Sequence, residues 1–208
     1  KNIHMKSLLH HEYVSINSKN AKYRIILLHG WGADADDLLP VGQKITDGLN
    51  KDFEIISLRA PNPRADNIGR QWYGLYPANW SEAEHEVNKL TSTLIEIGNY
   101  GIPLSNTILL GFSQGAAMSI AAGSSLNIGL LVSCSGYPHP NWDKKINSPI
   151  LLSHGIRDEV VPLAASRRLY EDLKKYSNYS CNLYEFNGFH EIDINFIDVI
   201  RTEINSIF

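Results

Sequence analysis

One stretch decides the fold predicted for this chain: Ile108-Leu109-Leu110-Gly111-Phe112-Ser113-Gln114-Gly115-Ala116-Ala117-Met118. An apolar run typical of a buried strand is followed by the pattern Gly-x-Ser-x-Gly and then by small residues typical of a helix. The two glycines permit a sharp turn that presents the Ser113 hydroxyl at the start of the helix, as a nucleophile elbow requires. The alternative is an ordinary strand–loop–helix junction in which Ser113 caps the helix.

The rest of the chain alternates between strand-like and helix-like segments, which favours the α/β class with a mainly parallel sheet covered by helices on both faces. Apolar runs predict strands over residues 23–28, 53–58, 106–110, 130–135, 148–153 and 179–186. Helical spacing predicts helices over residues 33–50, 81–100, 114–122, 164–176 and 192–208. No internal boundary is visible, so residues 1–208 are expected to form a single domain.

Three local features refine this outline. Residues 8–17 and 23–28 are expected to form an edge hairpin. Residues 61–79 are rich in Pro, Gly, Asn and aromatic side chains without periodicity, and they predict a long loop. Ser81 with Glu84 three positions later predicts a capping box at the start of the next helix.

The composition argues against several classes of function. The chain has 208 residues, of which 43% are hydrophobic, and its net charge of -3 gives no basic face for nucleic acid. The apolar runs are shorter than the roughly 20 residues that cross a bilayer, and residues 1–6 do not resemble a signal peptide. The two cysteines, Cys134 and Cys181, predict buried free thiols and favour a reducing cytoplasm. No cofactor or metal is expected.

Functional groups in such folds gather at the carboxyl ends of the strands. A serine hydroxyl needs a base to become a nucleophile, and that base is usually a histidine oriented by a carboxylate. In this fold the expected order along the chain is Ser, then Asp or Glu, then His. Ser113, Asp158 and His190 satisfy that order, and each lies in a loop directly after a predicted strand.

His190 is selected from eight histidines. The others are expected to lie in the N-terminal segment before the core begins (His4, His10, His11), on a helix surface (His85), or at strand ends in structural roles (His29, His154). His139 is the main alternative as the base, although it precedes Asp158 and so breaks the order.

Asp158 is selected because it follows a strand end and precedes the apolar segment Val160-Val161-Pro162. Its rivals have simpler explanations. Asp143 suits a turn, Glu159 suits a solvated surface, and Asp193 suits the start of the last helix, where the helix dipole favours an acid.

The oxyanion of the transition state needs two backbone donors. The N–H of Gln114, directly after the nucleophile, is expected to supply one. The loop His29-Gly30-Trp31-Gly32 is expected to supply the second, for which the N–H of Trp31 is the best candidate.

Taken together, these residues resemble the phospholipase/carboxylesterase family of α/β-hydrolases, which includes acyl-protein thioesterases and small bacterial carboxylesterases. The matching stretches are Leu28-His29-Gly30-Trp31-Gly32, Arg59-Ala60-Pro61-Asn62-Pro63, Gln71-Trp72-Tyr73, Gly111-Phe112-Ser113-Gln114-Gly115-Ala116-Ala117, Ser135-Gly136-Tyr137, His154-Gly155 with Asp158 and Pro162, and Gly188 with His190. They follow the family's order over nearly the whole chain.

The resemblance implies an α/β-hydrolase fold with little or no lid domain, a Ser113–Asp158–His190 triad and an oxyanion hole from the Trp31 and Gln114 amides. It also implies an acyl pocket near the side chains Trp72, Tyr73, Leu75 and Val160. Two departures bear on substrate range: Tyr73-Gly74-Leu75 replaces the family's Phe-Asp after the tryptophan, and Glu191 directly follows the histidine.

The sequence therefore predicts a serine carboxylesterase that hydrolyses short- to medium-chain acyl esters through an acyl-enzyme on Ser113. An acyl-protein thioesterase or lysophospholipase with the same triad is the alternative, and a non-catalytic binding module is a third. The expected partner is a small-molecule ester, with neither nucleic acid nor an integral membrane segment. Oligomeric state stays open, with a homodimer as one alternative.

Overall fold

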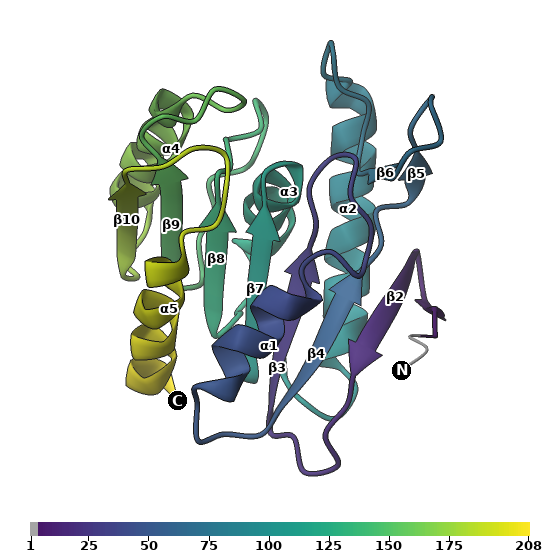
Figure 1. The fold of residues 1–208 in the computed structure, drawn as a ribbon, viewed down its shortest axis with the longest axis vertical. Helices are drawn as coiled ribbons and strands as arrows, with labels where there is room; N and C mark the ends of the chain where they lie inside the picture. The colour runs from purple at the N-terminus through teal and green to yellow at the C-terminus, as the bar shows by residue number, and fades with distance from the viewer. Residues whose placement is uncertain (1–3) are drawn as a thin grey trace.

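The computed structural model describes residues 4–208, which contain one eight-stranded sheet (Figure 1). Its strands are β1 (Lys6–Leu8), β2 (His11–Ile16), β3 (Tyr23–Leu28), β4 (Phe53–Leu58), β7 (Thr107–Phe112), β8 (Leu130–Cys134), β9 (Ile150–Gly155) and β10 (Cys181–Phe186). They lie in the order β1-β2-β4-β3-β7-β8-β9-β10. Strands β4, β3, β7, β8, β9 and β10 are parallel, and β1 and β2 add an antiparallel edge. The mainly parallel α/β sheet predicted from the sequence is confirmed.

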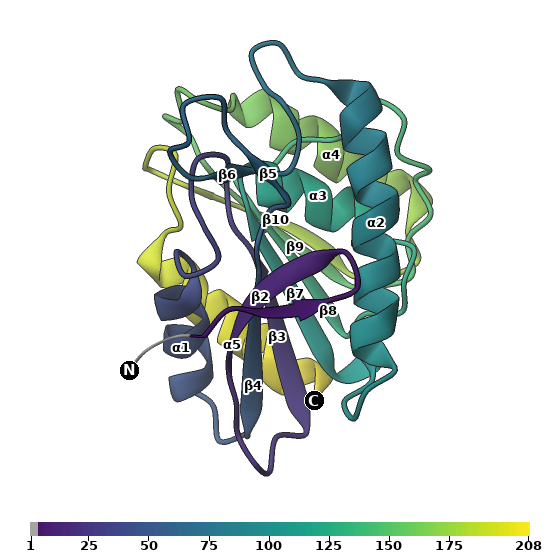
Figure 2. The same cartoon turned by 90° about the vertical axis from the view of Figure 1, so that its right-hand side faces the viewer.

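Helices cover both faces of this sheet (Figure 2). α1 (Leu39–Asp47) and α5 (Ile194–Ile207) pack on one face, and α2 (Trp80–Gly98), α3 (Gln114–Gly123) and α4 (Leu163–Tyr176) pack on the other. The strands are buried on both sides because alternate residues point to opposite faces. In β3, Ile25 and Leu27 join the core under α1 and α5, whereas Ile26 and Leu28 join the core under α2, α3 and α4.

The predicted edge hairpin is wrong. β2 pairs antiparallel with β4, with Tyr13 opposite Leu58, and its hairpin partner is β1. The central strand β3 is already paired with parallel β4 on one side and β7 on the other. The N-terminal residues therefore reach the outer edge of β4 instead.

Two helix starts also differ from the prediction. α1 begins at Leu39 rather than near residue 33, with Pro40 in its first turn, where a missing N–H costs nothing. α2 begins at Trp80, and its cap is Asn79, whose Oδ1 accepts the N–H of Glu82 at 3.1 Å. The predicted capping box at Ser81 is therefore wrong, because Asn79 already occupies the capping position.

The long loop over residues 61–79 contains a short antiparallel pair, β5 (Asn62–Pro63) with β6 (Arg70–Gln71). A 3₁₀ turn, η1 (Leu104–Asn106), precedes β7. Across residues 4–208 the structure has no helix that is both long and apolar enough to cross a membrane. Figure 1 shows the loops that follow β7, β9 and β10 at the same end of the sheet, where the predicted catalytic side chains should meet.

Candidate active site

Ser113 lies in a strained turn between β7 and α3. Its φ of 57° and ψ of -116° are unusual for a residue with a side chain, and such conformations cost on the order of 1–3 kcal/mol. The flanking glycines make the turn sterically feasible. A Cβ on Gly111 would lie 2.3 Å from the carbonyl oxygen of Gly115, and a Cβ on Gly115 would lie 2.1 Å from that of Leu28. Because these two glycines have no Cβ atoms, the first turn of α3 can approach the end of β3.

Three side chains meet beside this turn. The Oγ of Ser113 lies 3.0 Å from Nε2 of His190, and Nδ1 of His190 lies 2.7 Å from Oδ2 of Asp158. An ionised carboxylate only accepts hydrogen bonds, so Nδ1 carries the proton and Nε2 presents its lone pair to the Ser113 hydroxyl. The side chain of Asp158 is fully buried, whereas 19% of the His190 side chain is exposed. The arrangement places a base within reach of a serine hydroxyl.

Asp158 and His190 meet because their loops pack on each other through the backbone. The N–H of Arg157 donates to the carbonyl of Gly188 at 2.9 Å, and a Cβ on Gly155 would lie 2.1 Å from the carbonyl oxygen of Phe189. The acid that follows the histidine belongs to this loop: Oε1 of Glu191 accepts the N–H of Phe189 at 3.1 Å. Glu191 thus stabilises the loop that carries His190.

A second buried imidazole, that of His154, lies near the same carboxylate oxygen of Asp158 as His190. Oδ1 of Asp158 accepts the N–H groups of Val160 and Val161, both at 2.8 Å. Its Oδ2 lies 3.4 Å from Nε2 of His154, which donates to the carbonyl of Val161 at 2.7 Å. The sequence predicted a structural role for His154 without naming its partner. The signal was available, because His154 precedes Asp158 by four residues across one strand end.

The two amides predicted for the oxyanion hole flank the nucleophile. Within residues 4–208 neither the N–H of Trp31 nor that of Gln114 donates a hydrogen bond to another group of the chain. A Cβ on Gly30 would lie 3.4 Å from the Cβ of Ser113, so the loop over residues 29–32 lies directly against the elbow. Both donors are therefore available to a ligand.

His29 fixes the orientation of the Trp31 amide. Its Nε2 accepts the N–H of Ala60 at 3.0 Å, so Nδ1 carries the proton and donates to the carbonyl of Gly30 at 2.8 Å. Because the peptide bond is planar and trans, fixing the Gly30 carbonyl also fixes the N–H of Trp31. Burial lowers the pKa of His29 and favours this neutral imidazole. The sequence predicted a structural His29 but not this link.

The side chains named for the acyl pocket divide into two pairs. Trp72 and Tyr73 have no exposed surface, whereas Val160 is 57% exposed and Leu75 is partly buried. The indole of Trp72 donates to the carbonyl of His29 at 2.9 Å. The side chain of Gln114 accepts the N–H of Trp72 at 2.9 Å and donates to the carbonyl of Tyr73 at 2.8 Å. In this structure Trp72 and Tyr73 support the site from the core rather than form its surface.

The Phospholipase/Carboxylesterase family profile matches residues 9–208. The chain belongs to the phospholipase/carboxylesterase family. The predicted resemblance and the α/β-hydrolase fold are thereby confirmed.

Several members of this family are similar to the chain over most of their length. An acyl-protein thioesterase 1 from Candida albicans is 27% identical over 90% of this chain and 94% of its own. The esterase YpfH of Escherichia coli is 28% identical over 74% of this chain and 69% of its own. Esterase PE8, known from a crystal structure, is 26% identical in sequence to this chain. The match covers 99% of this chain and 98% of the PE8 chain, with a TM-score of 0.83. A carboxylesterase from Mesorhizobium loti, 19% identical with a TM-score of 0.84, covers 99% of this chain and 100% of its own and shares the fold.

Two other histidines of this family member lie away from Ser113. The expectation that His11 precedes the core is wrong: it is 3% exposed, and its Nδ1 lies 2.8 Å from Oγ1 of Thr93. The sequence missed this because residues 11–16 form an inner strand of the sheet edge, covered by α2. The alternative base His139 lies 2.9 Å from the hydroxyl of Tyr73, in an aromatic cluster beside α2.

Within the described part of the chain, the cysteines and the possible metal ligands show no arrangement suited to catalysis or metal binding. Neither cysteine forms a disulfide, and burial raises the pKa of both Cys134 and Cys181 to about 12. Among the described residues 4–208, no group of three or more His, Cys, Asp or Glu side chains could hold a metal ion.

Proposed function

We propose that this family member is a serine carboxylesterase in which Ser113 is the nucleophile, His190 the general base and Asp158 the residue that orients His190. The observation that carries this proposal is the continuous hydrogen-bonded path, 3.0 Å from Ser113 to His190 and 2.7 Å from His190 to Asp158. The family's esterase and thioesterase members support it.

The reaction runs in two halves. The Ser113 oxygen attacks the acyl carbonyl as Nε2 of His190 takes its proton, and the same nitrogen returns that proton to the leaving alcohol. The amides of Trp31 and Gln114 donate to the developing oxyanion, where one well-aimed donor contributes about 3 kcal/mol. Water, deprotonated by His190, then releases the acid from the acyl-enzyme. Asp158 stays ionised and holds the imidazolium.

For the substrate we propose a short- to medium-chain acyl ester that contacts Leu75 and Val160. The support is the exposed apolar surface beside Asp158: Val160 is 57% exposed and Phe189 is 49% exposed. Trp72 and Tyr73, whose side chains are fully buried, would support this surface from the core without contacting the acyl group. The unpaired cysteines support a cytoplasmic location.

A thioester or lysophospholipid substrate is the second candidate. It is favoured by relatives from several yeasts that are named acyl-protein thioesterase 1 and cover most of this chain. The triad chemistry is the same, and only the leaving group changes from an oxygen to a sulfur or a glycerophosphate alcohol.

The test is a matched series of oxygen esters and thioesters with acyl chains from two to sixteen carbons. We expect kcat/KM to peak at short or medium length and to favour oxygen esters. A maximum for long-chain thioesters would assign the chain to the second candidate. Turnover that persists at the wild-type rate in a Ser113→Ala variant would exclude both.

A further inference from the structure

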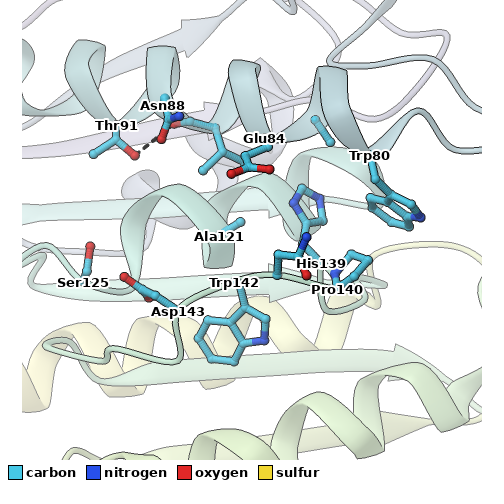
Figure 3. A pocket seen from close by; sticks show the side chains of 13 residues that line it. Trp80, Glu84, Asn88, Thr91, Ala121, Ser125, His139, Pro140, Trp142 and Asp143 are labelled. Atoms are coloured by element: carbon cyan, nitrogen blue, oxygen red, sulfur yellow. Dashed lines mark hydrogen bonds between the residues drawn. The ribbon is translucent and has the colours of Figure 1, made fainter.

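A pocket away from Ser113 lies between α2 and the segment 139–143 that follows β8 (Figure 3). Its volume is about 270 Å³, and Ala121 of α3 and Ser125 just after α3 form part of its wall. Ser113, Asp158 and His190 are absent from its lining. The pocket is therefore a separate site.

The pocket lining contains aromatic side chains and carboxylates, so its charged groups are all negative. Trp80 and Trp142 supply indole rings, and Glu84 and Asp143 supply carboxylates. Figure 3 shows both carboxylates among the residues facing the pocket. Within the described chain no Lys or Arg side chain lines the pocket. Indole faces and carboxylates both attract organic cations.

His139 adds a directed polar atom. This residue is 7% exposed, and its Nε2 lies 2.9 Å from the hydroxyl of Tyr73. Its Nδ1 has no hydrogen-bond partner among residues 4–208 and belongs to a side chain that lines the pocket. Figure 3 shows the imidazole between Glu84 and Trp80. Burial lowers the pKa of His139 to about 4, so the ring is neutral at pH 7 and one of its nitrogens is an acceptor.

A short hydrogen-bonded chain leads from His139 through the hydroxyl of Tyr73 to that of Tyr137. The two tyrosine oxygens lie 2.6 Å apart. A donor at Nδ1 of His139 would place the ring proton on Nε2, which then donates to the Tyr73 oxygen. The Tyr73 hydroxyl would in turn donate to Tyr137. A ligand with N–H donors thus satisfies the whole chain.

We propose that this pocket binds the primary ammonium group of an alkylamine, either a free amine or a lysine side chain. The ammonium group donates to Glu84 and to Nδ1 of His139, and the alkyl stem packs on the ring of Trp80. Asp143, whose Oδ1 also accepts the N–H of Lys145 at 3.0 Å, adds long-range attraction. The site needs no assumption about the ester that Ser113 cleaves.

The test is a titration of the full chain with butylammonium, followed by the indole N–H signals in a ¹H–¹⁵N spectrum. The signals of Trp80 and Trp142 should shift, and that of Trp31 beside Ser113 should not. Butyrate, which has the opposite charge, should leave all three unchanged. The variant Glu84→Gln should weaken binding about 5-fold, as expected for a partly exposed ion pair.

Glu171→Gln is the matched control, because Glu171 is an exposed carboxylate on α4 outside the pocket. It should bind butylammonium as the wild type does. Equal shifts with butyrate, or wild-type affinity in a folded Glu84→Gln variant, would overturn the proposal. A titration with Nα-acetyl-lysine methylamide tells whether the ammonium group comes from a lysine side chain or from a free amine. Binding at least 10-fold tighter than that of butylammonium assigns the site to a lysine side chain. Equal or weaker binding assigns it to free amines.

Discussion

The two halves of the proposed active site are held in different ways. The catalytic half, Ser113 with Asp158 and His190, is fixed by strand ends and by backbone contacts between adjacent loops. The loop half, residues 29–33 and 60–76, also has backbone bonds, from the N–H of Gly32 to the Arg70 carbonyl and from the N–H of Arg70 to the Ala33 carbonyl, and side chains add to them. Gln71 accepts the indole N–H of Trp31 at 3.0 Å, and Arg70 donates to the carbonyls of Ala60 and Pro61. The catalytic half thus depends mainly on backbone contacts at the strand ends, whereas the oxyanion loop and substrate surface depend in addition on side chains that join distant segments.

The largest expected effect comes from breaking the catalytic half at Ser113. Ser113→Ala removes the nucleophile and should lower kcat for a chromogenic short-chain ester by on the order of 10⁵-fold. Because alanine adds no atom to the turn, the thermal melting curve should match the wild type. Residual activity above a few per cent would contradict the role of Ser113.

Asp158→Asn should have the next largest effect. An asparagine side chain cannot accept from His190 and the two valine amides in the same way as a carboxylate, and it favours the wrong histidine tautomer. We expect kcat/KM to fall on the order of 10⁴-fold. The control is Glu159→Gln, an exposed neighbour, which should stay within 2-fold of the wild type.

The loop half is tested by His29→Asn, which removes the pair of bonds that hold the Gly30 and Ala60 backbone. The Trp31 amide then loses its fixed direction, and kcat should fall about 10-fold with a smaller change in KM. Arg64→Leu is the control, since its guanidinium lies 3.9 Å from the Trp31 ring and does not hold the amide. Equal effects of the two variants would show that the loop is held in another way.

Acid should weaken the packing around the loop half through two buried histidines, His29 in the loop itself and His11 in β2. His11 and His29 flank Trp72 with ring centroids 5.8 Å away in both cases, and burial lowers the pKa of His11 to about 4 and that of His29 as well. The unfolded chain binds these protons near pH 6.5 and the folded chain does not. Stability is therefore fully present above that pH and is lost as the pH falls toward 4.

For His11 alone the loss between pH 7 and pH 5 is about 2 kcal/mol. Urea unfolding at the two pH values measures it. His11→Asn cannot titrate in this range, so the variant should lose that much less stability than the wild type over the same interval. An identical pH dependence in both proteins would show that folding does not lower the pKa of His11.

The sequence was sufficient for the parallel part of the sheet, the elbow and the meeting of three strand ends, but not for the antiparallel edge. Gly111 and Gly115 specify their turn locally, and parallel strands bring their carboxyl ends together, so Asp158 and His190 could be placed without coordinates. The burial of Trp72 and Tyr73 could not be predicted. It depends on Gln114, some 40 residues later, which holds their backbone, and on His11, which entered the core because β2 pairs with β4. No local pattern encodes such contacts.

The nucleophile is tested most directly by labelling the intact protein with a fluorophosphonate and mapping the adduct by peptide mass spectrometry. A single adduct on the peptide that contains Ser113, absent in Ser113→Ala and strongly slowed in Asp158→Asn, is the predicted result. Wild-type protein that hydrolyses esters but takes up no label, or takes it up at another residue, would contradict Ser113 as the nucleophile.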